Sequence, residues 1–358
     1  METIDFRLAE HHDNEGILRL MHSIVMPGDI ELIYMKNPDF FKSIETQGFE
    51  MQVLAACTHE EKKIVGTGVR ALRKAYINGI PRTVGYLGDL RISPEVRHRK
   101  VLYNGYAAMK KLMTDGRAYL HFTTIVEGNR TAKAALTWKN KAGTIPNYVD
   151  FGLLKTSFVF PLFKMSCGRK FSVSHAEEKE IDVIADFIDG HAKQRQFHPV
   201  YTQESFMNLR DFHINDFVVA RYNGKIAGVA ALWDQTGFKQ LLVKKYNGKM
   251  RIMKRLFNRF LPEEGEIIPN ACLSFIAVQD DRTDIFRALL SHISNDIRKS
   301  RLRYFMVCLH ETDPLNEALR FFPRLTYKSR LYLADYDDTE SIRARVDGRI
   351  PYVEVATL

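Results

Sequence analysis

One stretch, GYLGDLRISPEVRHRKVLYNGYAAMKKLM over Gly85–Met113, decides the fold of this chain. It opens as a strand-like run, passes Pro94, and continues through four consecutive basic residues at 97–100. The spacing then predicts a helix over about 101–115, which Gly116 closes. The first N–H groups of a helix have no partner within it, and the helix dipole favours negative charge there. The stretch therefore predicts a strand that leads into an anion-binding helix end.

The residues before this stretch change from helical to strand-like periodicity. FRLAEHHD predicts a short strand, and helices are expected over about 14–25 and 39–46. Three strand-like runs follow, FEMQVLAACTH, KIVGTGVRALRKAYI and RTVGYLGDLRIS, and the last two are joined by the turn Asn78-Gly79. Because Asn-Gly is a strong hairpin signal, we expect an antiparallel meander.

The residues after the stretch continue the alternation of strands and helices. AYLHFTTIVEG is β-rich, and a helix is expected from Asn129, a natural cap, to about Lys139. NYVDFGLLKTSFVFP then supplies another strand. The predicted order is strand, two helices, three meandering strands, helix, strand, helix and strand.

This order, together with Gly85–Met113, resembles the GNAT N-acetyltransferase superfamily. Its central motif has a strand, a Gln/Arg-x-x-Gly-x-Gly/Ala loop and a helix. Arg97 occupies the Gln/Arg position, whereas Lys100 and Leu102 occupy the two glycine positions. Glycine there permits close approach of phosphate to the backbone. The motif is therefore degenerate, although its loop is strongly basic.

The resemblance implies that the first domain binds acetyl-CoA or another acyl-CoA as co-substrate. The strand would present backbone groups to the pantetheine arm, and the loop would hold the pyrophosphate. The cofactor-binding residues implied are Leu90, Arg91, Ile92, Arg97, His98, Arg99, Lys100, Val101, Leu102 and Asn129. The tyrosine that commonly acts as general acid in the family is replaced by Leu136, with Trp138 beyond it.

Acyl transfer to an amine also needs a route for the amine proton. Asp89 in the fourth strand and Glu127 at the end of the fifth are the predicted catalytic bases, because these strands diverge around the acyl group in the family. Tyr103, Tyr106 and Tyr148 are further candidates to supply a proton, and the spacing does not select among them.

After Lys170 the same order of elements repeats. We expect a GNAT-like acyltransferase domain over 1–165, a second, degenerate GNAT-like domain over 170–338, and a C-terminal tail over 339–358. The turn matching the phosphate loop, AVQDDRTD, is acidic, so the second domain is not expected to bind CoA. An added amphipathic helix, basic from Arg251 to Arg259, separates two of its strands.

The fold class expected is α+β, with a mixed α/β sheet, as two tandem GNAT-like domains that each have a mostly antiparallel sheet flanked by helices. The 358 residues suit two domains. No apolar run reaches the length of a membrane span, and the N-terminus lacks the order of a signal peptide, so a cytoplasmic location is expected. The four cysteines and the histidines have no metal-site spacing, and no metal is predicted.

Charge is the main clue to partners. The net charge is +9, and the stretches 91–111 and 239–259 are both rich in Lys and Arg. These suit a phosphorylated co-substrate, an acidic acyl carrier protein or, less readily, nucleic acid. The leading hypothesis is an N-acyltransferase, in the first place an acetyltransferase, that moves an acyl group from acyl-CoA to an amine on a small molecule or peptide. The alternatives are an enzyme dependent on acyl carrier protein or aminoacyl-tRNA, and a non-catalytic GNAT-like binding module.

Overall fold

The computed structural model describes residues 3–26, 28–96, 99–129, 132–133, 143–166, 168–256 and 261–358. The first half contains β1 (Ile4–Leu8), α1 (Asn14–Ser23), β2 (Ile30–Met35), α2 (Phe40–Ile44), β3 (Glu50–Thr58), β4 (Ile64–Ile77), β5 (Ile80–Ile92), α3 (Arg99–Met113), β6 (His121–Val126) and β7 (Asn147–Val159). The second half contains β8 (Ser172–His175), α5 (Ile181–Ala192), α6 (Gln203–Met207), β9 (Phe217–Tyr222), β10 (Lys225–Trp233), β11 (Gln240–Tyr246), α7 (Gly248–Leu256), β12 (Asn270–Val278), α8 (Thr283–Ile297), β13 (Tyr304–His310), β14 (Arg324–Asp335) and α9 (Thr339–Ala344).

Twelve of these strands form one continuous sheet, in the order β1-β3-β4-β5-β6-β14-β7-β13-β12-β10-β9-β8. The β5–β6 and β12–β13 pairs are parallel, and the other neighbours are antiparallel. The predicted mixed, mostly antiparallel sheet flanked by helices is thus confirmed. The meander is confirmed as well, because Asn78 and Gly79 both have positive φ and join β4 to β5 through a two-residue hairpin turn.

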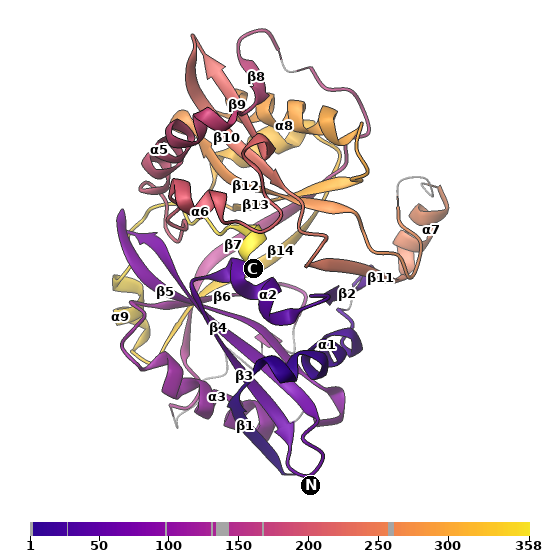
Figure 1. Ribbon diagram of the computed structural model, residues 1–358, viewed down its shortest axis with the longest axis vertical. Coiled ribbons are helices and arrows are strands. Elements are labelled where there is room, and N and C mark those ends of the chain that lie inside the picture. The colour runs from indigo at the N-terminus through magenta and orange to yellow at the C-terminus, as the bar shows by residue number, and fades with distance from the viewer. Residues whose placement is uncertain are drawn as a thin grey trace.

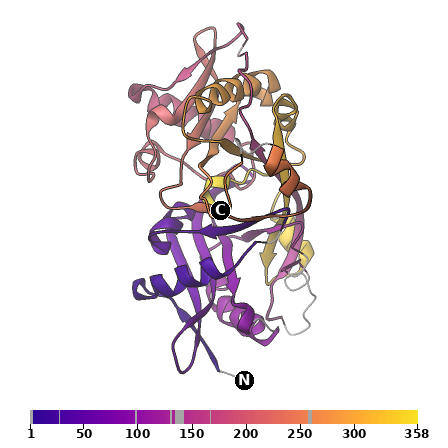
Figure 2. The same cartoon turned by 90° about the vertical axis from the view of Figure 1, so that its right-hand side faces the viewer.

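The two halves exchange their last strands across the middle of this sheet. β14, from the end of the chain, lies between β6 and β7, and β7 in turn pairs with β13. Figure 1 shows β7 and β14 side by side where the halves meet, and Figure 2 shows the halves stacked along the long axis. Each half therefore completes its sheet with a strand from the other.

Helices cover both faces of the sheet in each half. Val53 and Ala55 share a core with Ile17 of α1, whereas Leu54 between them packs with Met109 of α3. Successive side chains on a strand point to opposite faces, so α1 and α3 lie on opposite faces. The same alternation in β9 and β10 places α5 and α8 on opposite faces of the second half.

Two connections were not expected from the sequence. β2 and β11, which the sequence did not reveal as strands, pair with each other as a separate two-stranded sheet that links the halves. Segment 339–358, expected to be a tail, forms α9 and then packs inside the molecule, where Tyr352, Val353 and Ala356 are buried. No helix in the described ranges is both long and apolar enough to cross a bilayer.

Candidate functional site

A large cavity begins where β5 and β6 separate. Their parallel pairing joins Gly85 to His121 and Tyr86 to Phe122. Beyond these pairs, 88–92 of β5 and 123–126 of β6 both line a cavity of about 1060 Å³. The two strands diverge and leave a wedge-shaped opening in the sheet. An extended ligand that enters this opening can contact the backbone of β5.

A β-bulge turns this part of β5 toward the cavity. Thr67 lies opposite Arg91 and Val69 opposite Gly88, so Gly68 alone faces the two residues Asp89 and Leu90. Asp89 has a positive φ of 50°, and the Thr67 hydroxyl donates to the Asp89 carbonyl at 3.0 Å. The predicted pantetheine-contacting residues Leu90, Arg91 and Ile92 all line the cavity.

The predicted anion-binding helix end lies on the same cavity. α3 begins at Arg99, and Val101 and Leu102 line the cavity. Leu102 packs against Tyr106 and Ile125 in a small core beside the cavity. Lys100 is exposed. Arg97 and His98 lie outside the described residues, as does the Arg99 side chain.

Asn129 lies three residues beyond the end of β6 and also lines the cavity. Its side-chain oxygen accepts a hydrogen bond from the Ala132 N–H at 3.0 Å, which is the capping contact predicted for it. Leu136 and Trp138, at and beyond the position of the usual family tyrosine, lie outside the described residues.

Asp89, one of the two predicted bases, lines the cavity but is held in a buried ion pair. Its carboxylate accepts from the fully buried Lys36 ammonium and from Gln47 Nε2, the latter at 3.2 Å. Burial alone would raise the pKa of the Asp89 carboxyl, but the positive charges of Lys36 and Arg91 bring that pKa below its ordinary value. Burial lowers the pKa of Lys36. Asp89 is therefore an ionised, oriented carboxylate.

Glu127, the other predicted base, points elsewhere. Its neighbours Val126 and Gly128 line the cavity, whereas the Glu127 carboxylate accepts from Arg330 of β14 at 3.1 Å and lies 3.7 Å from Lys133. The hydrogen bond from Arg330 is the main cause that holds the pKa of Glu127 below its usual value. The structure thus does not bring Glu127 and Asp89 to one site.

Two tyrosines meet at the cavity wall beside β6. The hydroxyls of Tyr106 on α3 and Tyr148 on β7 are 2.6 Å apart, and both residues line the cavity. Burial raises the pKa of Tyr106 to about 12, so its hydroxyl stays protonated at neutral pH. Tyr103, the third tyrosine considered, is more exposed, and its hydroxyl accepts from Thr144.

The second half supplies the other wall of the cavity. This wall is mainly apolar and aromatic and includes Leu241, Tyr246, Ile268, Tyr304 and Met306. Lys239 is a buried exception. Its ammonium donates to the main-chain carbonyl of Ala356 at 2.7 Å, and burial, followed by the charge of Lys36, lowers its pKa to about 7.

The corresponding wedge in the second half is filled by the chain itself. β12 pairs with β13 through 270–272 and then carries its own bulge, where Phe275 has a positive φ of 56°. The Phe275 N–H donates to the buried Glu354 carboxylate at 2.9 Å, and the Ile276 N–H donates to the Tyr352 hydroxyl at 3.2 Å. The backbone groups that a ligand would need there already have partners.

No protein-family model and no curated protein sequence matches the chain, whereas solved structures match nearly all of it. A GCN5-related glucosamine N-acetyltransferase region of a fungal multi-domain GH3 β-N-acetylglucosaminidase has a TM-score of 0.63 at 12% identity, over 93% of this chain but 38% of that one. Saccharomyces cerevisiae N-myristoyltransferase with bound myristoyl-CoA has a TM-score of 0.60 at 10% identity, over 93% of this chain and 83% of that one.

A tandem GNAT protein from the clavulanic acid biosynthesis pathway is similar over 94% of this chain and 99% of its own, with a TM-score of 0.57 and 12% identity. This chain spans 38% of the length of the fungal glucosaminidase, so it corresponds to a region of that protein. At these identities the likeness concerns the fold. The chain has the tandem GNAT fold that the sequence predicted.

Proposed function

We propose that this protein is an N-acyltransferase that moves an acyl group from acyl-CoA to an amine. The observation that carries the proposal is the cavity at the divergence of β5 and β6, which is bounded by the β5 bulge and by the N-terminus of α3. A thioester with a long pantetheine arm needs an extended polar backbone edge and an anion-binding helix end. The first half provides both within one cavity.

In this proposal the first half holds the donor. The backbone of Leu90, Arg91 and Ile92 contacts pantetheine, and the α3 N-terminus with Lys100 binds the pyrophosphate. Leu102 leaves room for it because its side chain belongs to the core. The second half has acids at its matching turn, and its bulge is occupied by Glu354 and Tyr352, which supports a single donor site per chain.

The acceptor amine would enter from the side of the second half. The wall there is apolar apart from a few polar groups, so the favoured acceptor carries its amine on a largely apolar body. The cavity of about 1060 Å³ has to accommodate the pantetheine arm and the acceptor as well as the acyl group, and the proposal includes acyl groups longer than acetyl.

The chemistry forms a C–N bond and breaks the C–S bond of the thioester, while one proton leaves nitrogen and one reaches sulfur. Attack on the thioester makes the nitrogen far more acidic, and Asp89 on the cavity wall is the proposed acceptor of its proton. Tyr106, paired with Tyr148, would donate a hydrogen bond to the departing thiolate. It would take the role of the family tyrosine whose position Leu136 occupies.

The proposal is tested by incubating the protein with acetyl-CoA, octanoyl-CoA, palmitoyl-CoA and an acylated carrier protein, each with a panel of amines, and measuring thiol release and N-acyl product. We expect turnover with at least one acyl-CoA and a saturable thermal shift with CoA. Turnover with the acylated carrier protein but with none of the acyl-CoA donors would identify acyl carrier protein as the donor. No shift and no product with any donor would refute the enzyme assignment.

The role of Tyr106 is tested in the same assay with matched hydroxyl deletions. Tyr106→Phe should lower kcat by about tenfold to a hundredfold, because it removes a positioned donor, with little change in KM. Tyr103→Phe, on the same helix but outside the cavity wall formed by Tyr106 and Tyr148, is the control and should retain activity. Equal rates for both variants would count against Tyr106.

A further inference from the structure

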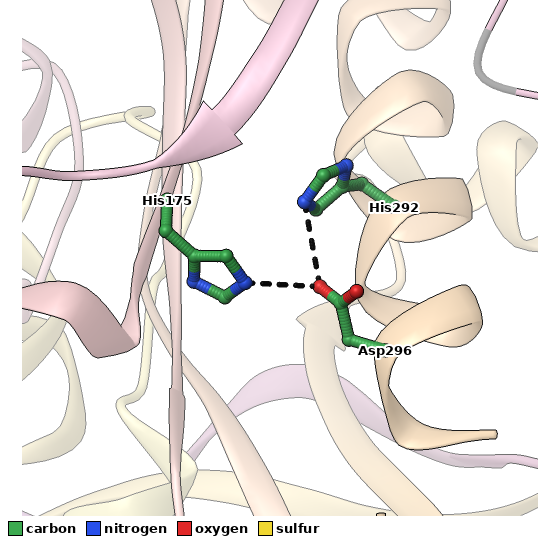
Figure 3. Close-up of side chains that lie close together, drawn as sticks. All are labelled: His175, His292 and Asp296. Atoms are coloured by element: carbon green, nitrogen blue, oxygen red, sulfur yellow. Dashed lines mark hydrogen bonds and ion pairs between the residues drawn. The ribbon is translucent and has the colours of Figure 1, made fainter. Parts of the chain in front are cut away.

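Three side chains from distant parts of the second half converge away from the cavity. His175 ends β8, the edge strand of the sheet, and His292 and Asp296 lie one turn apart on α8. Figure 3 shows both imidazole rings pointing at the same carboxylate oxygen. His175 Nε2 is 3.1 Å and His292 Nε2 is 3.4 Å from Asp296 Oδ2.

These distances resemble the edges of a tetrahedral coordination shell. With metal–ligand bonds of about 2.0–2.1 Å, neighbouring ligand atoms of a tetrahedral Zn²⁺ site are separated by about 3.3 Å. Two of the three separations already have this length, and the three ligand atoms all lie within 4.8 Å of one another. Two histidines and one carboxylate, with a fourth position left for water, is an established zinc ligand set.

The hydrogen bonds of His175 point to a cation more specifically. Its Nδ1 lies 2.7 Å from the Asn215 main-chain oxygen, and because a carbonyl can only accept, Nδ1 carries the proton. In the neutral ring, Nε2 therefore presents a lone pair to the Asp296 carboxylate. Two electron-rich atoms at 3.1 Å repel unless a positive charge lies between them, either a proton or a metal ion.

This arrangement is also how metal-binding histidines are held. The ring nitrogen that does not bind the metal usually donates to a backbone carbonyl or a carboxylate, which fixes both the tautomer and the ring orientation. The i,i+4 spacing on α8 places the side chains of His292 and Asp296 next to each other on one face of the helix. All three residues retain solvent access, with side-chain exposures of 51% for His175, 24% for His292 and 36% for Asp296.

We infer that His175, His292 and Asp296 form a binding site for a divalent transition-metal ion such as Zn²⁺, which clamps edge strand β8 to α8. The site lies at the opposite end of the second half from the shared central strands, so its role is to hold structure rather than to take part in acyl transfer. β8 is only four residues long and follows the segment that connects the halves, so a clamp there stabilises the start of the second half.

The test uses the full chain, treated with EDTA and dialysed, and titrated with ZnCl₂ by calorimetry at neutral pH. We expect one saturable site that raises Tm, and His292→Gln and Asp296→Asn should each weaken Zn²⁺ binding by about tenfold or more. His59→Gln is the matched control, because His59 also pairs with an aspartate, Asp5, at 2.8 Å but belongs to no group of three metal-binding side chains among the described residues. It should leave the Zn²⁺ affinity unchanged.

A second measurement distinguishes a metal ion from a proton as the positive charge between His175 and Asp296. If a proton occupies the place of the metal in the free protein, Zn²⁺ must displace it, and titrations in buffers of different ionisation enthalpy should show release of about one proton per metal. Co²⁺ in place of Zn²⁺ should give a tetrahedral visible spectrum. Absence of saturable binding, or equal affinity in the wild type and both ligand variants, would overturn the site.

Discussion

At the scale of single residues, the Lys36–Asp89 pair combines a structural role with the proposed role of Asp89 as a base. Both side chains are almost completely buried, and Asp89 also occupies the bulge of β5 on the cavity wall. A charge in such a place is tolerated because its partner is fixed opposite it. Removing one member leaves the other charge buried and uncompensated, which costs more than the pair itself contributes.

We therefore expect Asp89→Asn to lower the free energy of unfolding by about 3 kcal/mol or more, measured by chemical denaturation. Adding Lys36→Met should restore much of that loss, because no buried charge then remains. Glu15→Gln, which removes a carboxylate from the exposed pair with Arg19, should hardly move the unfolding midpoint. A small effect of Asp89→Asn, similar to that of Glu15→Gln, would show that Lys36 gains solvent or another partner.

His121 illustrates how the burial of one histidine makes the stability of the fold depend on pH. Arg70 Nε donates to His121 Nε2 at 3.0 Å, which requires that nitrogen to be unprotonated, and burial, reinforced by the charge of Arg70, lowers the pKa of His121 to about 3. The unfolded chain protonates this histidine near pH 6.5, whereas the folded protein does not. Folding thus becomes less favourable as pH falls from 6.5 toward 3.

The expected contribution of His121 is about 1.4 kcal/mol of unfolding free energy lost for each pH unit below 6.5. His121→Gln should make the decline of stability between pH 6.5 and 4.5 shallower by roughly that slope, measured by denaturation at several pH values. His12→Gln, at an exposed position, should preserve the wild-type slope. Parallel curves for wild type and His121→Gln would contradict a neutral buried imidazole.

At the scale of elements, the site depends on how one strand ends and the next helix begins. The bulge in β5 and the early start of α3 place a polar backbone edge and a helix N-terminus on one cavity. Both features are formed by the backbone, so in the proposed function the donor site tolerates Lys100 and Leu102 at the glycine positions of the motif. The proposed phosphate contact at the helix end then depends on the charge around it.

The helix-end assignment predicts a position-dependent effect of charge along α3. Lys100→Glu, in its first turn, should weaken CoA binding by about tenfold, or about 1.4 kcal/mol, because a negative charge then faces the pyrophosphate. The measurement is calorimetry at low salt, and the effect should shrink as salt screens it. Lys111→Glu, exposed in the last turn, makes the same change in net charge. Equal weakening by both would indicate general attraction rather than a helix-end site.

At the scale of the whole molecule, the halves are repeats in sequence order but not independent in structure. β14 fills the gap between β6 and β7 over eleven registered pairs with β7, and β2 pairs with β11. The cavity also has walls from both halves. Acceptor specificity, in the proposed function, is therefore a property of the joined molecule.

Residues 1–165 expressed alone should not form a stable domain, because β6 and β7 would lose the strand that lies between them. Size-exclusion chromatography and circular dichroism should show aggregation or poor folding. Co-expression with residues 166–358 is the control, since the same cut then leaves all strands present, and a soluble 1:1 complex is expected. A monomeric fragment 1–165 with cooperative unfolding would contradict the exchange of strands.

The sequence by itself determined the elements whose signals are local. Periodicity, the Asn78-Gly79 turn and the stretch from Gly85 to Met113 predicted the meander, α3 and the tandem fold, because turn chemistry and amphipathic patterns depend on neighbours within a few residues. The resemblance to the GNAT superfamily singled out Leu90, Arg91, Ile92 and Asn129, and all four line the cavity.

Only the tertiary structure decided the features that join distant residues. These are the exchange of β7 and β14, the β2–β11 pair, the ion pair of Asp89, the Arg330 contact that turns Glu127 away, and the meeting of His175 with His292. No spacing in the chain encodes them, because strand partners and buried charges are chosen by which surfaces must be covered once all the elements are packed together. The sequence predicted a degenerate phosphate-loop motif, and the packing determined which of its residues line the cavity.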